Sequence, residues 1–228
     1  MSCMGLGGVK RARVLTSDRL CAATEVALLF VFVLLLVWSV PATPQPLRFY
    51  SSVAILTWIF GLTIMSHLAY GETLDDLGLG GKGIGRALSD LYIPVGIIAL
   101  ILLAIGFFLG TLRINHKLFL NILGIPFWAL FQQYAAQSFV NRRLQIVFGP
   151  GKLSACFTAL IFAAVHLPNP ALVVATLVAG YIWARAFQRV PNLYIIALSH
   201  GLLSALFVNV MPKSILPNMV VGYNYLLK

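Results

Sequence analysis

Long apolar runs separated by short charged segments are the feature that most limits how this 228-residue chain can fold. A helix needs about 20 apolar residues to cross the hydrocarbon core of a bilayer. Five runs reach about that length (22–41, 50–70, 91–112, 118–140 and 192–211), and two shorter ones lie at 153–167 and 171–187. Because backbone polar groups in lipid must be hydrogen-bonded within the protein, we predict an all-α, polytopic membrane helix bundle of about seven transmembrane helices.

The basic residues predict the orientation of these helices. The chain is 60% hydrophobic and only 10% charged, yet it carries a formal net charge of +10. With a cytoplasmic N-terminus, eleven of the 16 basic residues fall on the inner side, which agrees with the positive-inside rule. The inner set is Lys10, Arg11, Arg13, Arg19, Lys82, Arg86, Arg142, Arg143, Lys152, Arg185 and Arg189, and the outer set is Arg48, Arg113, Lys117, Lys213 and Lys228.

These features predict a multi-pass protein of the cell membrane whose partner is the lipid bilayer. Nucleic-acid binding is not expected, because the basic residues flank apolar runs and do not form a stripe. We divide the chain into a basic cytoplasmic N-terminal segment (1–20), three transmembrane helices with a cytoplasmic loop at 71–90 (21–117), a core (118–211) and a C-terminal tail (212–228). The loop is expected to be solvated, or in part to lie along the lipid headgroups.

Polar side chains inside the later apolar runs are the candidate site. No aspartate or glutamate follows Asp90, yet these runs contain glutamines and histidines. Polar groups in hydrocarbon are costly and usually mark a function. Residues four apart share a helix face, and three such pairs result: Gln133 with Gln137, Phe162 with His166, and His200 with Ser204. Gln132 precedes Gln133 in the same apolar run.

We expect these three helices to converge on one polar pocket, since their polar residues can lie at similar depths. The alternative is that each polar side chain only bridges helices through a hydrogen bond, worth about 0.6 to 2 kcal/mol. Two other histidines, His67 and His116, belong to none of these pairs and are taken as structural. Glu25, the only acid in a predicted span, is expected near its cytoplasmic end.

The ordered motifs resemble those of the CPBP family of membrane-embedded peptidases, also called the Abi or CAAX-protease family. The family pattern is Glu-Glu-x-x-x-Arg on one helix, Phe-x-x-x-His on the next, and His-x-x-x-Asn or Asp on a later helix. The matching stretches, within about 127–207, are Gln132-Gln133-x-x-x-Gln137, Phe162-x-x-x-His166 and His200-x-x-x-Ser204. The resemblance implies that residues 118–211 form a CPBP-like core.

The resemblance also implies roles for individual residues. His166 would assist the attacking water, while His200 with its neighbour at 204 would stabilise the oxyanion. The other four positions differ from the family: Gln132 and Gln133 replace the glutamates, Gln137 the arginine and Ser204 the asparagine. A glutamine can orient water but cannot accept its proton near neutral pH. Losing the acids and the arginine together suggests a polar network rebuilt without ions.

Three functions are therefore weighed. The first is a CPBP-type endopeptidase that acts on a membrane-proximal peptide, with His166 as general base and His200 and Ser204 polarising the scissile carbonyl. The second is a catalytically silent relative that uses the same pocket to bind a peptide, lipid or partner helix, and the residues leave open which of the two is right. A transporter is a further alternative, although the spans lack the intramembrane acid of proton-coupled carriers.

No cofactor is expected. Catalytic zinc commonly has three protein ligands, and only two histidines are in register here. Glutamine oxygen is a poor third ligand for a transition metal.

Overall fold

The computed structural model describes residues 16–112 and 116–227. Within these ranges the chain is helical and has no strands, which confirms the predicted all-α class. The predictions made for Lys10, Arg11, Arg13, Arg113 and Lys228 lie outside the described residues, as does most of the predicted N-terminal segment.

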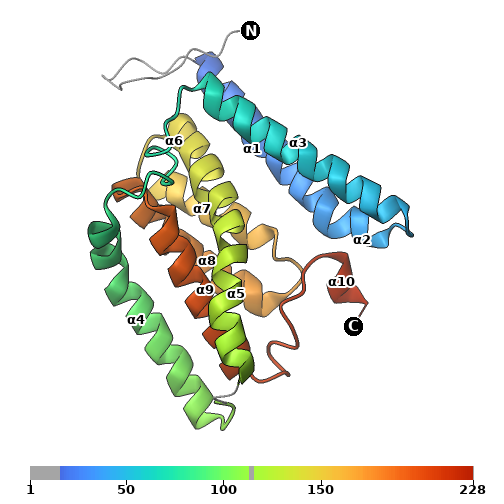
Figure 1. Cartoon of the computed structure of the whole chain (residues 1–228), viewed down its shortest axis with the longest axis vertical. Helices are drawn as coiled ribbons and strands as arrows, with labels where there is room; N and C mark the ends of the chain where they lie inside the picture. The colour runs from blue at the N-terminus through green and yellow to red at the C-terminus, as the bar shows by residue number, and fades with distance from the viewer. Residues whose placement is uncertain (1–15, 113–115, 228) are drawn as a thin grey trace. The chain divides into compact units, whose positions relative to one another are not determined.

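The described chain divides into two compact units, each assembled from separate stretches of sequence. The first unit contains the described parts of 1–73, 139–180 and 220–228. Its helices include α1 (Thr16–Leu34), the π-helix η1 (Leu35–Ser39), α2 (Val40–Ala42), α3 (Leu47–Ala69), α6 (Arg142–Phe148), α7 (Lys152–Ala164), the first half of α8 (Pro170–Arg189) and α10 (Tyr223–Leu226). Within this unit α1 runs alongside α3 (Figure 1).

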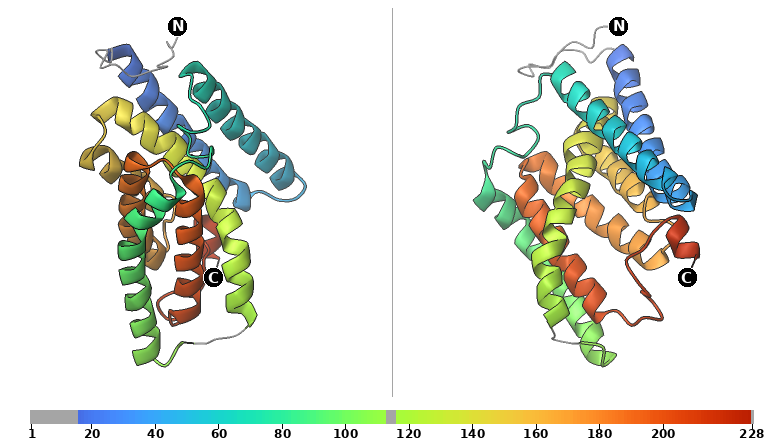
Figure 2. Two further views of the ribbon diagram at one scale, coloured as in Figure 1. Left: turned by 60° about the vertical axis from the view of Figure 1, so that its left-hand side comes forward. Right: turned by 45° about the vertical axis from the view of Figure 1, so that its right-hand side comes forward.

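The second unit contains residues 74–138 and 181–219. It is built from α4 (Ile84–Phe108), α5 (His116–Gln133), most of the π-helix η2 (Tyr134–Asn141), the second half of α8 and α9 (Leu193–Val210). Helix α9 lies between α4 and α5, as Figure 2 shows. The candidate residues of the first and third motifs all belong to this unit.

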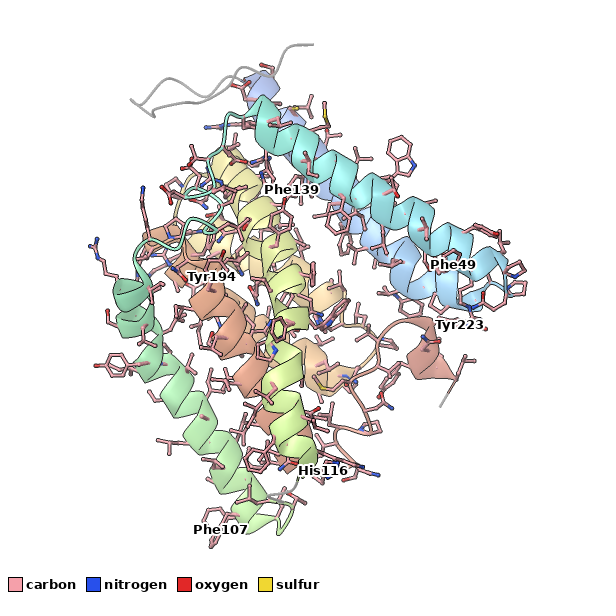
Figure 3. The ribbon with its side chains drawn as sticks, in the orientation of Figure 1. Phe49, Phe107, His116, Phe139, Tyr194 and Tyr223 are labelled. Carbon is pink, nitrogen blue, oxygen red and sulfur yellow. The ribbon has the colours of Figure 1, made fainter. Side chains whose placement is uncertain are left out.

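Among the residues that the structure describes, five helical segments are long and apolar enough to cross a membrane: Thr16–Ala42, Leu47–Ala69, Ile84–Phe108, Pro170–Arg189 and Leu193–Val210. The other two predicted spans do not qualify by themselves: α5 contains several polar residues, and α7 has 13 residues. Seven spans therefore stay a prediction. Large apolar side chains such as Phe49 and Phe107 are 62% and 72% exposed, as expected where a helix faces lipid (Figure 3).

The last part of the connection predicted as a loop at 71–90 is helical. Helix α4 already begins at Ile84. Before it, the carbonyl of Gly78 accepts a hydrogen bond from the Leu193 amide (2.9 Å), and the carbonyl of Leu79 accepts one from the Tyr194 hydroxyl (3.0 Å; Tyr194 is labelled in Figure 3). The loop carbonyls thus satisfy donors at the start of α9, where a helix leaves its first amides unpaired.

Candidate functional site

A chain of uncharged polar side chains runs between two helices of the second unit. The Gln137 amide nitrogen donates to Gln133 Oε1 (3.1 Å), and Gln133 Nε2 lies 3.0 Å from His200 Nδ1. Both glutamines are completely buried, and His200 is 6% exposed. The amide pair predicted to share a face therefore does so, and it reaches the histidine of the third motif.

Local structure explains how the two helices come this close. Helix α5 passes directly into η2, a π-helical stretch that carries Gln137, and such stretches recur at functional sites. On α9 the residue after His200 is Gly201, where an added Cβ would lie 2.6 Å from the backbone nitrogen and Cα of Pro126 in α5. Only a residue without a side chain fits this crossing, as expected for the small residues that let membrane helices approach.

The imidazole of His200 is also held from a second side. The indole ring of Trp183, from the second half of α8, lies 4.5 Å from it between ring centroids, with an angle of 34° between the ring planes. The Trp183 Nε1–H donates to the Ser199 hydroxyl (3.0 Å), which donates in turn to the Ile196 carbonyl (2.8 Å). With its partner ring anchored, His200 has little freedom to turn.

Gln132 and Ser204 lie on the same two helices but take no part in this chain. Both residues are partly exposed, and neither side chain makes a hydrogen bond within the part of the protein that the structure describes. Gln133, in contrast, uses both polar atoms of its carboxamide within the chain. The side chains at 132 and 204 are therefore the ones left to meet a ligand or water.

His166 belongs to the first unit, at the turn between α7 and α8. Its Nδ1 lies 2.7 Å from the Phe162 carbonyl oxygen, and its ring lies 5.0 Å from the Phe162 ring between centroids. A carbonyl oxygen can only accept a hydrogen bond, so Nδ1 carries the proton and Nε2 of a neutral ring has a free lone pair. The predicted face shared by Phe162 and His166 is confirmed, while their convergence with the other two motifs stays a prediction.

The donor set does not suit a metal ion. Gln133 turns its amide N–H toward His200 while its oxygen accepts from Gln137, so neither atom is left for coordination. Within residues 16–112 and 116–227, no group of three or more His, Cys, Asp or Glu side chains is arranged to hold a metal. We derive no metal-dependent step from these residues.

A second polar cluster, in the first unit, was missed by the sequence reading. Here Arg143 is completely buried and binds two carboxylates at once: its Nη1 and Nη2 each lie 3.0 Å from an oxygen of Glu72, and its Nε lies 2.8 Å from Glu25. The Ser66 hydroxyl donates to Glu25 (2.7 Å), and His67 Nδ1 donates to Glu72 (2.6 Å). We call this set, together with Arg142, which also pairs with Glu72, the ionic cluster.

The backbone at the end of α3 delivers Glu72 to this cluster. Gly71 has a φ of +63°, and the amides of Gly71 and Glu72 donate to the carbonyls of Leu68 (3.1 Å) and His67 (3.0 Å). This is the hydrogen-bond pattern of a Schellman cap, which glycine favours because a left-handed residue is needed there. The turn reverses the chain and brings the carboxylate beside the arginines of α6.

The electrostatics of Glu72 exclude it as a replacement base. Burial favours its neutral form, but hydrogen bonds from His67 and Arg143, with the charges of Arg143 and Arg142, outweigh burial and lower its pKa from 4.5 to about 2. Such a carboxylate stays ionised and already has its hydrogen-bond partners. Beside it, burial raises the pKa of the Tyr70 hydroxyl above its ordinary value. Glu72 therefore does not supply the missing general base.

Comparison with known proteins agrees with the recognition made from the motifs. Residues 118–206 match the family model described as type II CAAX prenyl endopeptidase Rce1-like. This segment is Rce1-like and matches the CPBP family. The Rce1-like segment contains all three motifs, from Gln132 to Ser204. No curated protein and no solved structure matches the chain.

Proposed function

We propose that the protein is a CPBP-type membrane endopeptidase that hydrolyses a membrane-proximal peptide. The observation that supports this most is the environment of His166, whose Nδ1–H is tied to a backbone carbonyl and whose Nε2 is left as a base. A neutral imidazole has one nitrogen with a lone pair, which can accept a proton. It can therefore take over the general-base step that a glutamine at 132 cannot perform.

In this mechanism Gln132 orients the attacking water through its amide, and His166 Nε2 removes the proton. His200 and Ser204 donate hydrogen bonds to the oxygen of the tetrahedral intermediate. When the intermediate collapses, the C–N bond breaks and the protonated His166 returns its proton to the leaving nitrogen, which releases a carboxyl product and an amine. One oxyanion donor typically contributes 10²–10³-fold to the rate. The family model suggests a prenylated peptide ending in a CAAX motif as the first substrate to test. We further propose that the protein resides in the cell membrane with its N-terminus in the cytoplasm, as the basic residues predict.

The test uses the full chain in lipid nanodiscs with a fluorogenic prenylated CAAX peptide. We expect His166→Ala and His200→Ala each to lower the cleavage rate by about 10²-fold or more. The matched control is His116→Ala, since His116 is exposed at the start of α5. Cleavage at the wild-type rate in both site variants would exclude this mechanism.

A second candidate is a non-catalytic relative that binds a peptide, lipid or partner helix in the same place. It is favoured by the Gln137–Gln133–His200 chain, in which the residues at the family's charged positions now satisfy one another. The double variant Gln132→Glu with Gln133→Glu separates the two. Cleavage gained only in this variant would identify a silenced peptidase scaffold.

A further inference from the structure

The direction of the hydrogen bonds around Gln133 carries information about His200. The Gln133 oxygen is occupied by the N–H of Gln137, so the Gln133 carboxamide presents its nitrogen, a donor, to the imidazole. A neutral imidazole has one donor and one acceptor nitrogen. A donor 3.0 Å from Nδ1 requires Nδ1 to be the acceptor.

We propose that Gln133 is a positioning residue that fixes the tautomer of His200, with Nδ1 unprotonated and the proton on Nε2. The tautomer follows from the hydrogen bonds alone, and only its role in binding an oxyanion rests on the proposed function. In this tautomer Nε2 of His200 carries an N–H and no lone pair. It is a permanent hydrogen-bond donor of the kind an oxyanion requires, and it carries no charge in the apolar core.

The residue type at position 133 decides which nitrogen of His200 carries the proton. A carboxylate accepts hydrogen bonds and does not donate them, so a glutamate at 133 would draw the proton onto His200 Nδ1. The ring would then expose a lone pair at Nε2 or become a cation. With glutamine, His200 and His166 hold their protons on opposite nitrogens, because His166 donates from Nδ1 to the Phe162 carbonyl. One histidine is left as a base and the other as a donor.

Gln137 and Trp183 hold the side chains of Gln133 and His200 in these orientations, so the tautomer of His200 does not depend on a transient rotamer. Gln137 orients the carboxamide of Gln133 by donating to its oxygen, and Trp183 covers one face of the imidazole. All four side chains belong to the second unit, and the two glutamines are completely buried. Bulk water therefore does not compete for the Gln133–His200 hydrogen bond.

The experiment is nitrogen NMR on the full chain in lipid, with ¹⁵N-labelled histidine and glutamine and with His200 assigned through a His200→Gln variant. In the wild type we expect His200 Nδ1 to resonate as an unprotonated nitrogen, to lack a directly bonded proton, and to show a cross-peak to the Gln133 side-chain amide. A proton bonded to His200 Nδ1 would overturn the proposal, whatever the enzymatic activity.

Two variants test whether Gln133 is what fixes the tautomer of His200. Gln133→Glu should move the proton to Nδ1, whereas Gln132→Glu adds the same charge one residue away and should leave the tautomer unchanged, since Gln132 makes no hydrogen bond to the ring. An unchanged tautomer in a folded Gln133→Glu protein would refute the role of Gln133. If that variant does not fold, the wild-type measurement still decides. A correct tautomer in a protein that cleaves no peptide would refute the proposed function and leave this inference standing.

Discussion

The two units stabilise buried polar groups by opposite means. The first unit gathers two carboxylates and two guanidinium groups in the ionic cluster, so that charge is balanced by charge. The second unit links two amides and an imidazole with no formal charge. In the ionic cluster Arg143 and Glu72 each have several polar partners, whereas in the uncharged chain Gln133 reaches the His200 ring through one hydrogen bond. The ions hold one another in place, and the neutral groups set the direction of the hydrogen bond at His200.

The largest effect should come from removing one ion of a buried pair. Arg143→Ala leaves Glu25 and Glu72 without their shared partner, and breaking a buried ion pair from one side costs about 3–5 kcal/mol. We expect this loss in the free energy of unfolding, measured by SDS titration in mixed micelles. The control is Arg189→Ala, because Arg189 is 59% exposed and lies 3.9 Å from Asp90. A surface pair contributes about 0–1 kcal/mol. Equal losses in the two variants would show that the buried pairs of Arg143 contribute no more to stability than an exposed pair does.

Acid should weaken the first unit through Glu72. Its pKa is lowered from 4.5 to about 2 in the folded protein, so its contribution to stability is fully present above pH 4.5 and is lost as the pH falls toward 2. The loss is on the order of 3 kcal/mol at most. We expect the unfolding midpoint to fall in this pH range and the fall to be smaller in Glu72→Gln. The uncharged chain has no carboxyl to titrate there, so an equal fall in Glu72→Gln would place the acid sensitivity elsewhere.

Sequence alone reached the fold class and the three motifs because both depend on local patterns. Apolar runs report helices segment by segment, and a four-residue spacing places Gln133 and Gln137 on one face before any tertiary contact is known. The ionic cluster could not be predicted from the sequence, because Arg143 and Glu25 are 118 positions apart and no periodicity links them. The sequence predicts Glu25 near the cytoplasmic end of its span, and it gives no sign of the pairing with Arg143. The hydrogen-bond direction at His200 depends on three side chains together and likewise has no sequence signature.

A smaller effect is expected where α5 and α9 cross. Gly201→Ala places a Cβ 2.6 Å from the Pro126 backbone, and overpacking of this kind typically costs 1–3 kcal/mol. Gly124→Ala is the matched control, because an added Cβ at Gly124 in α5 meets nothing within 4 Å. We expect the Gly201 variant to lose stability and to weaken the Gln133–His200 cross-peak, and the Gly124 variant to do neither. Loss of stability without any change at His200 would separate the helix crossing from the polar chain.

The smallest effect should distinguish neutral from ionic networks most sharply. Gln137→Leu removes the donor to the Gln133 oxygen, and a single hydrogen bond between membrane helices or side chains contributes about 0.6 to 2 kcal/mol. Adding Gln133→Leu should cost less than a second such loss, because replacing both partners by apolar groups removes the unsatisfied oxygen. In the ionic cluster the first loss is also the larger one, but it amounts to about 3–5 kcal/mol. We therefore expect a double-mutant cycle in SDS titrations to give a coupling energy of about 1 kcal/mol for the amide pair. Additive losses at 133 and 137 would mean that the two amides do not act as one chain, and His200 would then depend on Gln133 alone.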